Sequence, residues 1–165
     1  MKDIDDTDRR ILGLLQQDDR QSLAALGRQV GLAASSVNDR IRRLVTRGAI
    51  GGFHAHVVPE AVGLELLAFI FVGWSDPVAE APFLKQISAA SAVQECHHVT
   101  GEWNYLLKVR LANTRELEAF LNNVIKSVRG VQRTETLIVL SSAKETAALP
   151  LPEPPARRRT RVRAR

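Results

Sequence analysis

Two short amphipathic segments on either side of a glycine constrain the fold of this chain more than any other feature. Apolar residues recur at helical spacing in residues 23–30 and again in residues 37–45, and Gly31 lies between them. A glycine in this place permits the positive φ angle that a tight turn requires. Two helices joined by a turn that contains glycine predict a helix-turn-helix.

The second of these predicted helices is polar and rich in arginine outside its apolar side. Short polar side chains lie near its start, where they suit contacts with base edges, and the arginines that follow can bind phosphates or guanine. We therefore predict that DNA is contacted by Ser35, Ser36, Asn38, Asp39, Arg40, Arg42, Arg43 and Arg47. The alternative is an ordinary amphipathic helix whose basic face is solvated.

A further helix is predicted ahead of the motif. Apolar residues at helical spacing up to position 15 follow Asp5 and Asp6, either of which is a suitable N-cap. Ser22 is the expected N-cap of the next helix. Ala33 is a poor N-cap for the recognition helix, so we expect Ser35 to take that role and the helix to begin a residue or two late. The three helices together predict a winged or tri-helical DNA-binding core.

The basic charge of the chain lies mostly in its tail. The 165 residues carry 23 Lys and Arg against 18 Asp and Glu, a net charge of +5. Residues 156–165 hold six arginines and no acid, so the rest of the chain has 17 basic and 18 acidic residues. The arginine cluster of residues 40–47 is therefore better evidence for phosphate contacts than the overall charge, because such contacts depend on where charge lies.

The apolar pattern changes after the motif. Residues 53–58 alternate between two faces and end at Pro59, which predicts a strand at a hinge between two domains, followed by a short helical turn over residues 59–63. Beyond the hinge we expect strands at residues 66–74, 93–100, 104–111 and 131–142, and helices at residues 82–91 and 113–130. This β-α-β-β-α-β order is typical of the ferredoxin-like arrangement, so the predicted fold class is α+β.

Four segments follow from this pattern. They are a helix-turn-helix domain at residues 1–52, a hinge strand and linker at residues 53–63, a ferredoxin-like domain at residues 64–149 and a tail at residues 150–165. The tail holds four of the seven prolines and six arginines and has no hydrophobic period, so it is expected to be disordered.

Several cellular settings do not fit the composition. The single cysteine, Cys96, excludes an internal disulfide and fits a reducing cytoplasm, which is the expected location. The first residues are acidic and lack the apolar region of a signal peptide. The longest apolar run, residues 66–74, is far shorter than the ~20 residues that span a bilayer, so no membrane association is expected.

The histidines do not suggest a metal site. His54 and His56 share a face of their predicted strand but have no evident third ligand. His97 and His98 are adjacent in a predicted strand and therefore point to opposite faces. No phosphate-binding glycine loop or nucleophile motif is present. We therefore expect no metal, no cofactor and no catalytic residue.

The order of these elements resembles the Lrp/AsnC family of bacterial and archaeal transcription regulators. The resemblance covers about residues 3–151 and rests on DDTDRRILGLLQQDDRQSLAALGRQVGL, RIRRLVTRGAIGGFHAHVVPEAVGL, VTGEWNYLLKV and VQRTETLIVL. It implies a sequence-specific regulator that binds double-stranded DNA. It also implies that the second domain forms a homodimer, commonly assembled further into tetramers or octamers, and binds a small effector, usually an amino acid.

The resemblance places the effector near the turn between the middle strands and near the last strand. The implied contacts are Thr100, Gly101, Glu102, Trp103, Asn104 and Tyr105, with Thr134 and Thr136 as weaker candidates. Gly101 permits close backbone approach, Glu102 can accept from an ammonium group, and Trp103 can form an apolar wall. The family often carries Asp at the position of Asn104, and the neutral amide weakens the case for an ordinary amino acid. The alternative is a tight turn in which Trp103 is an interface residue.

Two other functions are compatible with parts of the pattern. Siroheme decarboxylases resemble the same two-domain architecture, and in such an enzyme His54, His56, His97 or His98 would serve the tetrapyrrole. A chromatin-like protein of low sequence specificity would bind DNA through the basic tail. The arginines of the predicted recognition helix, and the lack of an evident acid–base pair, favour the regulator.

Overall fold

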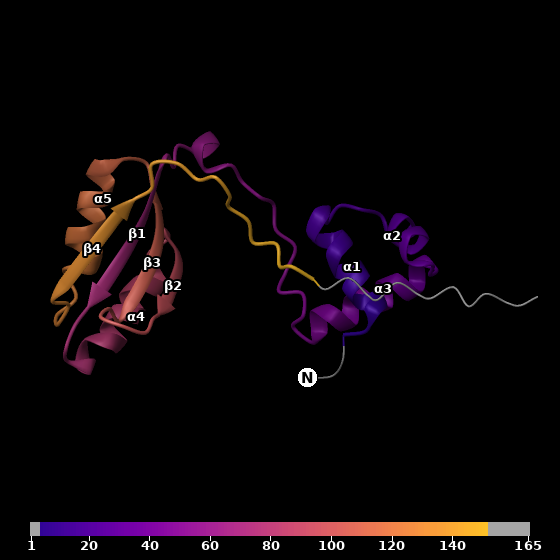
Figure 1. Ribbon diagram of the computed structural model, residues 1–165, viewed down its shortest axis with the longest axis horizontal. Helices are drawn as coiled ribbons and strands as arrows, with labels where there is room; N and C mark the ends of the chain where they lie inside the picture. Colours follow the sequence, from indigo (N-terminus) through magenta and orange to yellow (C-terminus); the bar gives the residue numbers. More distant parts are fainter. Residues whose placement is uncertain (1–3, 152–165) are drawn as a thin grey trace, which may run out of the picture. The chain divides into compact units, whose positions relative to one another are not determined.

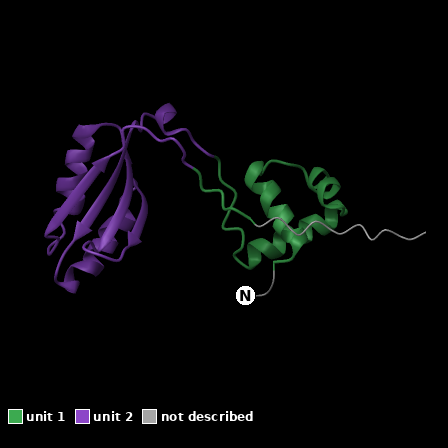
Figure 2. Ribbon diagram, in the orientation of Figure 1, with its two compact units in different colours: residues 1–55, 146–165 green, residues 56–145 purple. Residues whose placement is uncertain are grey.

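The computed structural model describes residues 4–151, so most of the predicted basic tail lies outside the described residues (Figure 1). The chain divides into two compact units (Figure 2). One comprises residues 1–55 together with residues 146–165, and the other comprises residues 56–145. Residues 146–149, which the sequence pattern assigns to the second domain, thus group with the helical unit.

Three helices form the first unit, which we call the helical unit. They are α1 (Asp6–Gln17), α2 (Leu23–Val30) and α3 (Ala34–Thr46). Each contributes one nearly inaccessible side chain to a small core, in which Ile11, Leu26 and Val37 meet. The described part of this unit contains no strand, so the core is tri-helical rather than winged.

The ends of these helices follow the predicted capping chemistry. Asp5 is the N-cap of α1 and accepts a hydrogen bond from the backbone N–H of Asp8, whose side chain accepts in return from the N–H of Asp5. This reciprocal arrangement is a capping box. Ser22 Oγ accepts from the N–H of Ala25 at the start of α2. Gly31 has a φ angle of 73°, which confirms the predicted left-handed turn before α3.

The start of α3 differs from the prediction. The helix begins at Ala34 with Ala33 in the N-cap position, and no side chain caps it. The prediction that Ser35 is the cap is therefore wrong. The N–H of Leu32 donates to the carbonyl oxygen of Gly27, and this closed turn leads the chain directly into α3. The turn, rather than the capping preference of one side chain, sets where the helix begins.

The second unit is an antiparallel four-stranded sheet with helices packed on one face. Its strands are β1 (Leu66–Gly73), β2 (Val93–His98), β3 (Tyr105–Leu111) and β4 (Arg133–Ile138), in the spatial order β2-β3-β1-β4. Its longer helices are α4 (Glu80–Ala89) and α5 (Thr114–Phe120), the latter continued by one π-helical segment, η3 (Leu121–Ile125). Two short 3₁₀ segments, η1 (Pro59–Val62) and η2 (Pro77–Ala79), complete it. The predicted β-α-β-β-α-β order and α+β class are confirmed.

Alternation along the strands separates a buried face from an open one. Ala68, Ile70 and Val72 of β1 are fully buried in the core that α4 and α5 cover. The residues between them, Phe69 and Phe71, point to the opposite side of the sheet. We call this opposite side the open face. It also carries Leu106 of β3 and Leu137 of β4, because these residues lie directly across from Phe71 and Phe69 in the strand register.

The segment between the motif and β1 is not the strand that the sequence pattern predicts. Phe53, Val57 and Val58 are each about half exposed, and no strand is assigned there. The prediction is wrong for the single chain because an extended segment becomes a strand only when a neighbour supplies hydrogen bonds, and residues 4–151 supply none. The predicted helical turn that follows is confirmed as η1.

Candidate DNA-contacting helix and effector turn

Helix α3 buries one side in the helical unit and presents the other to solvent. Val37 and Leu44 point into the unit and are almost fully buried. The structure brings the predicted contacts together on the rest of the helix. Asn38 and Arg40 are partly buried, and the exposed members are Ser35, Ser36, Asp39, Arg42, Arg43 and Arg47. An open groove of about 660 Å³ runs along this surface, lined by Leu32, Ser36, Asp39, Arg40, Arg42, Arg43 and Thr46.

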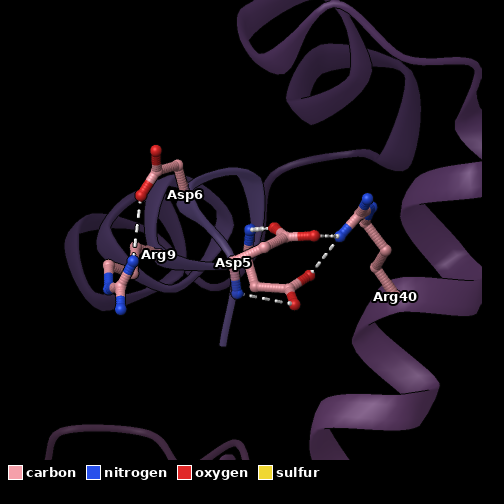
Figure 3. Close-up of polar contacts among 5 residues, drawn as sticks. Asp5, Asp6, Arg9 and Arg40 are labelled. Carbon is pink, nitrogen blue, oxygen red and sulfur yellow. Dashed lines mark hydrogen bonds and ion pairs between the residues drawn. The ribbon is translucent and has the colours of Figure 1, made fainter. Parts of the chain in front are cut away.

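Arg40 differs from the other arginines of α3, because it is engaged within the protein. Its Nη1 atom donates to Oδ2 of Asp5 at 2.6 Å and to Oδ1 of Asp8 at 2.7 Å (Figure 3). Only 23% of its side chain is exposed. The hydrogen bonds to Asp5 and then to Asp8 raise the pKa of Arg40. Burial by itself would raise the pKa of Asp5, but the hydrogen bonds from Arg40 and from the N–H of Asp8 outweigh it, so this pKa is lowered.

The remaining arginines of α3 leave their charge available. Arg42, Arg43 and Arg47 are exposed, and none of them pairs with a carboxylate within residues 4–151. Guanidinium groups in this state retain their donors for phosphate oxygens or for the acceptor edge of guanine. Two available cations on α3 and a third at its C-cap, Arg47, therefore make this helix the best candidate in the described chain for a DNA-contacting element.

The turn between β2 and β3 carries an aromatic–cation contact on the open face. The guanidinium carbon of Arg133 lies 4.5 Å from the ring centroid of Trp103, and the same guanidinium donates to the backbone oxygen of Glu102. The ring of Trp103 also lies 5.7 Å from that of Phe71, centroid to centroid. The charged group of Arg133 thus lies over an apolar wall in a turn that also carries Glu102, and an amino acid requires groups of these kinds.

Two other predicted effector contacts support the fold. Asn104 Oδ1 accepts from the backbone N–H of Trp74 at 2.8 Å, which ties β3 to the chain after β1. An aspartate oxygen would accept the same bond, so the amide in this chain preserves the acceptor and removes only a charge. Tyr105 is 5% exposed and donates from its hydroxyl to Glu80 Oε1 at 2.6 Å. Burial, together with this carboxylate, raises the pKa of Tyr105 to about 12.

The two weaker effector candidates lie on the other face of the sheet. Thr134 and Thr136 stand across from Val72 and Ile70 in the strand register, so they face the helices. Trp103 contacts residues of the open face instead. The structure therefore keeps Thr100, Gly101, Glu102 and Trp103 together in the turn and separates Thr134 and Thr136 from them.

Sequence reasoning missed two kinds of partner. It did not pair Arg40 with the first acids of α1, and it did not place Arg133 beside Trp103. Both pairs join residues about 30 positions apart, and the second depends on the register of β4 against β1. A single sequence contains no pattern from which either of these pairs could be predicted.

Neither a membrane span nor a metal cluster is found in the described chain. Among residues 4–151, no helix has the length and apolar character needed to cross a bilayer. Over the same residues, no group of three or more His, Cys, Asp or Glu side chains is arranged to hold a metal ion.

The fold and the site together define a two-domain DNA-binding protein, with a helix-turn-helix unit and a separate α+β unit. The family model of the AsnC-type helix-turn-helix domain matches residues 4–45, and that of the Lrp/AsnC ligand binding domain matches residues 67–149. The chain belongs to the Lrp/AsnC family of transcriptional regulators. The predicted function as a DNA-binding transcription regulator is confirmed, and these matches favour neither the decarboxylase nor the chromatin-like alternative.

Relatives from distant organisms match nearly the whole chain. The HTH-type transcriptional regulator FL11 of Pyrococcus abyssi is 37% identical over 148 residues, which are 90% of this chain and 97% of that protein. The proline dehydrogenase transcriptional activator of Rhizobium radiobacter is also 37% identical, over 87% of this chain and 94% of that protein. The crystal structure of a transcriptional regulator from Neisseria meningitidis in complex with L-Met has a TM-score of 0.86 at 31% identity, covering 90% of this chain and 97% of that chain.

Proposed function

We propose that α3 enters the major groove of operator DNA. The observation that carries this proposal is the exposed state of two arginines on α3 and of a third at its C-cap, none of which forms an ion pair within the described chain. Arg42, Arg43 and Arg47 are assigned to phosphates or guanine. The side chains assigned to base edges lie nearer the start of the helix and are Ser35, Ser36, Asn38 and Asp39.

The proposed DNA-binding form is a homodimer that pairs through the open face of the sheet. This face carries Phe69, Phe71 and Leu106, which are only partly buried, and Leu137, which is 49% exposed. Apolar side chains on an uncovered sheet face are stabilised when a second sheet packs against them. Higher assemblies, as tetramers or octamers, are proposed by family likeness alone.

The proposed effector is an amino acid bound at the turn of residues 100–103. Two observations support this class. The turn carries Glu102 beside Trp103 in sequence, and the guanidinium of Arg133, on β4, lies over the indole of Trp103. In addition, L-Met is bound in the related regulator from Neisseria meningitidis and in a feast or famine regulatory protein from M. tuberculosis, which is 34% identical with a TM-score of 0.83. The carboxylate of Glu102 is assigned to the ammonium group and the indole to the side chain of the effector.

The protein is proposed to act without catalysis and in the cytoplasm. Its relatives are named as transcriptional regulators. A protein that regulates genes must reach DNA, and in a bacterial or archaeal cell the DNA lies in the cytoplasm.

The test of the proposed function is selection of bound duplexes from a random pool, followed by anisotropy titrations on the enriched sequence. We expect Arg42→Gln with Arg43→Gln to weaken binding to that duplex and to flatten its salt dependence, because fewer phosphate contacts release fewer counterions. Arg28→Gln in α2 is the matched control, because Arg28 is exposed in the same unit but lies outside α3. If the double variant binds with unchanged affinity and unchanged salt dependence, α3 does not contact DNA.

A further inference from the structure

One nitrogen atom of the recognition helix is bound by both members of the capping box of α1. Asp5 and Asp8 already satisfy each other's backbone N–H groups at the start of that helix. Their remaining carboxylate oxygens converge on Nη1 of Arg40, at 2.6 and 2.7 Å, as Figure 3 shows for Asp5 and Arg40. We call these three residues the α1–α3 clamp.

Burial distinguishes the clamp from the ordinary surface ion pairs of this unit. The side chains of Asp8 and Arg40 are 10% and 23% exposed, and that of Asp5 is 50% exposed. The nearby pair of Arg9 and Asp6, also drawn in Figure 3, is 39% and 58% exposed. Exposed pairs contribute little to structure, whereas partly buried, charge-assisted hydrogen bonds hold their partners in one geometry. The clamp therefore fixes α3 against the start of α1, on the side of α3 that adjoins its exposed arginines.

We propose that Arg40 is a positioning residue for DNA binding and does not contact DNA itself. Its guanidinium is held by two carboxylates, so little of its charge is left for a phosphate. The clamp holds α3 at the angle at which Arg42 and Arg43 reach the groove. Breaking it leaves those arginines available but lets α3 sample other orientations, so affinity falls while the number of neutralised phosphates stays the same.

This inference rests on the proposed function of α3, and it gives two predictions that differ from those of a direct contact by Arg40. If Arg40 positions the helix, Arg40→Gln weakens operator binding by about tenfold without changing the salt slope. Asp5→Asn, which keeps a good N-cap and removes the charge, then also weakens binding. If Arg40 contacts a phosphate, Arg40→Gln flattens the slope, and Asp5→Asn strengthens binding because a repelling carboxylate is gone.

The experiment measures anisotropy on the selected duplex over a salt series for the full chain. The variants are Arg40→Gln, Asp5→Asn and the two combined, with Arg43→Gln as the matched control on the same helix. Circular dichroism establishes that each variant is folded. We expect the combined variant to be about as weak as Arg40→Gln alone, because both changes break the same ion pair. Arg43→Gln should flatten the salt slope by roughly 0.9 for each phosphate that the protein no longer neutralises.

Three results would overturn the assignment. They are a flatter slope for Arg40→Gln, a gain of affinity for Asp5→Asn, or a folded Arg40→Gln variant whose affinity is unchanged. Asp5→Asn remains informative if Arg40→Gln does not fold, because half of the Asp5 side chain is exposed and asparagine preserves the cap. The control separates the two proposals. An unchanged affinity and slope for Arg42→Gln combined with Arg43→Gln would refute DNA contact by α3. Flatter slopes for Arg43→Gln and for Arg40→Gln, each measured as a single variant, would refute only the positioning role.

Discussion

Residues of one chemical type carry different roles in this protein because their neighbours differ. Arg40 and Arg43 lie three positions apart on α3, yet the first is held by two carboxylates and the second is exposed. The same holds for two aromatic residues. Trp103, in the turn after β2, lies on the open face beside Arg133, whereas Tyr105, at the start of β3, is buried and donates to Glu80. Spacing along the sequence predicted both groups as contacts, and only the tertiary partners separate them.

A substitution at Asn104 tests whether its oxygen, rather than its charge state, matters for the fold. We expect Asn104→Ala to lower the free energy of unfolding by about 1–2 kcal/mol, because it leaves the N–H of Trp74 without its acceptor. Asn104→Asp retains an acceptor and should unfold close to the wild type. Urea denaturation of both variants measures the difference. Equal losses for the two variants would show that the amide has a role other than accepting this bond.

At the scale of elements, an ionic cluster joins β3 to the chain that leaves β4. Glu145 pairs with Lys108 and with Arg110, in both cases at 2.5 Å, and Arg110 also lies 3.8 Å from Glu60 of η1. The hydrogen bond from Lys108 is the main reason that the pKa of Glu145 is lowered, and the hydrogen bond to Glu145 likewise raises the pKa of Lys108. These ion pairs thus connect η1 and the segment after β4 to the same strand, β3.

The sign of these shifts fixes the pH window of the cluster. A carboxylate whose pKa is lowered by folding stabilises the protein above its ordinary value of 4.5, and this contribution is lost as the pH falls through the folded-state pKa. A lysine whose pKa is raised stabilises below its ordinary value of 10.5, and that contribution is lost as the pH rises through the folded-state pKa. The cluster is therefore fully effective at neutral pH.

Glu145→Gln should consequently destabilise the protein at neutral pH and much less in acid. We expect the difference in unfolding free energy from the wild type to shrink as the pH falls from about 4.5 through the lowered folded-state pKa of Glu145, because the wild-type carboxylate is protonated over that range. Denaturant unfolding at a series of pH values measures this difference. Glu118→Gln is the control, because Glu118 is exposed on α5 and has no ion pair in the described chain. A difference that does not vary with pH would show that Glu145 acts through packing instead.

At the scale of the whole molecule, regular elements were predictable and their surroundings were not. The apolar periods of residues 4–45 predicted three helices, and those of residues 66–138 predicted the order of the ferredoxin-like unit. The start of α3 at Ala34 was not predictable from capping preference, since the turn after α2 sets it. The extended segment around Phe53 has a strand pattern but no partner strand in the part of the chain that the structure describes. In each case the deciding interaction lies outside the local sequence.

The open face of the sheet gives a prediction about assembly. Leu137→Arg places a charge on that face at a position that is already half exposed, so the single chain should fold as before. We expect the dimer to dissociate at concentrations where the wild type is associated, because the charge must be buried unpaired in the interface. Sedimentation velocity measures the change. Val78→Arg, on η2 and 77% exposed, is the control. A dimer as strong as the wild type would place the interface elsewhere.

The end of the described chain gives a prediction about the basic tail. The side chain of Gln16 in α1 accepts from the N–H of Leu149 at 2.7 Å and donates to its carbonyl oxygen at 3.1 Å. The six arginines of residues 156–165 therefore follow a segment that is attached to the helical unit. Deleting residues 156–165 should lower affinity for unrelated DNA more than for the selected duplex, and should flatten the salt slope on both. Loss of all binding would instead favour the tail as the principal DNA contact.

The proposed regulator places two copies of α3 in successive major grooves on one face of a duplex. Hydroxyl-radical footprinting of the full-length protein on its selected duplex tests this most directly. We expect two protected patches, centred about 10 base pairs apart and related by the approximate two-fold symmetry of the site. Protection of a single patch, or uniform protection without register, would contradict this arrangement.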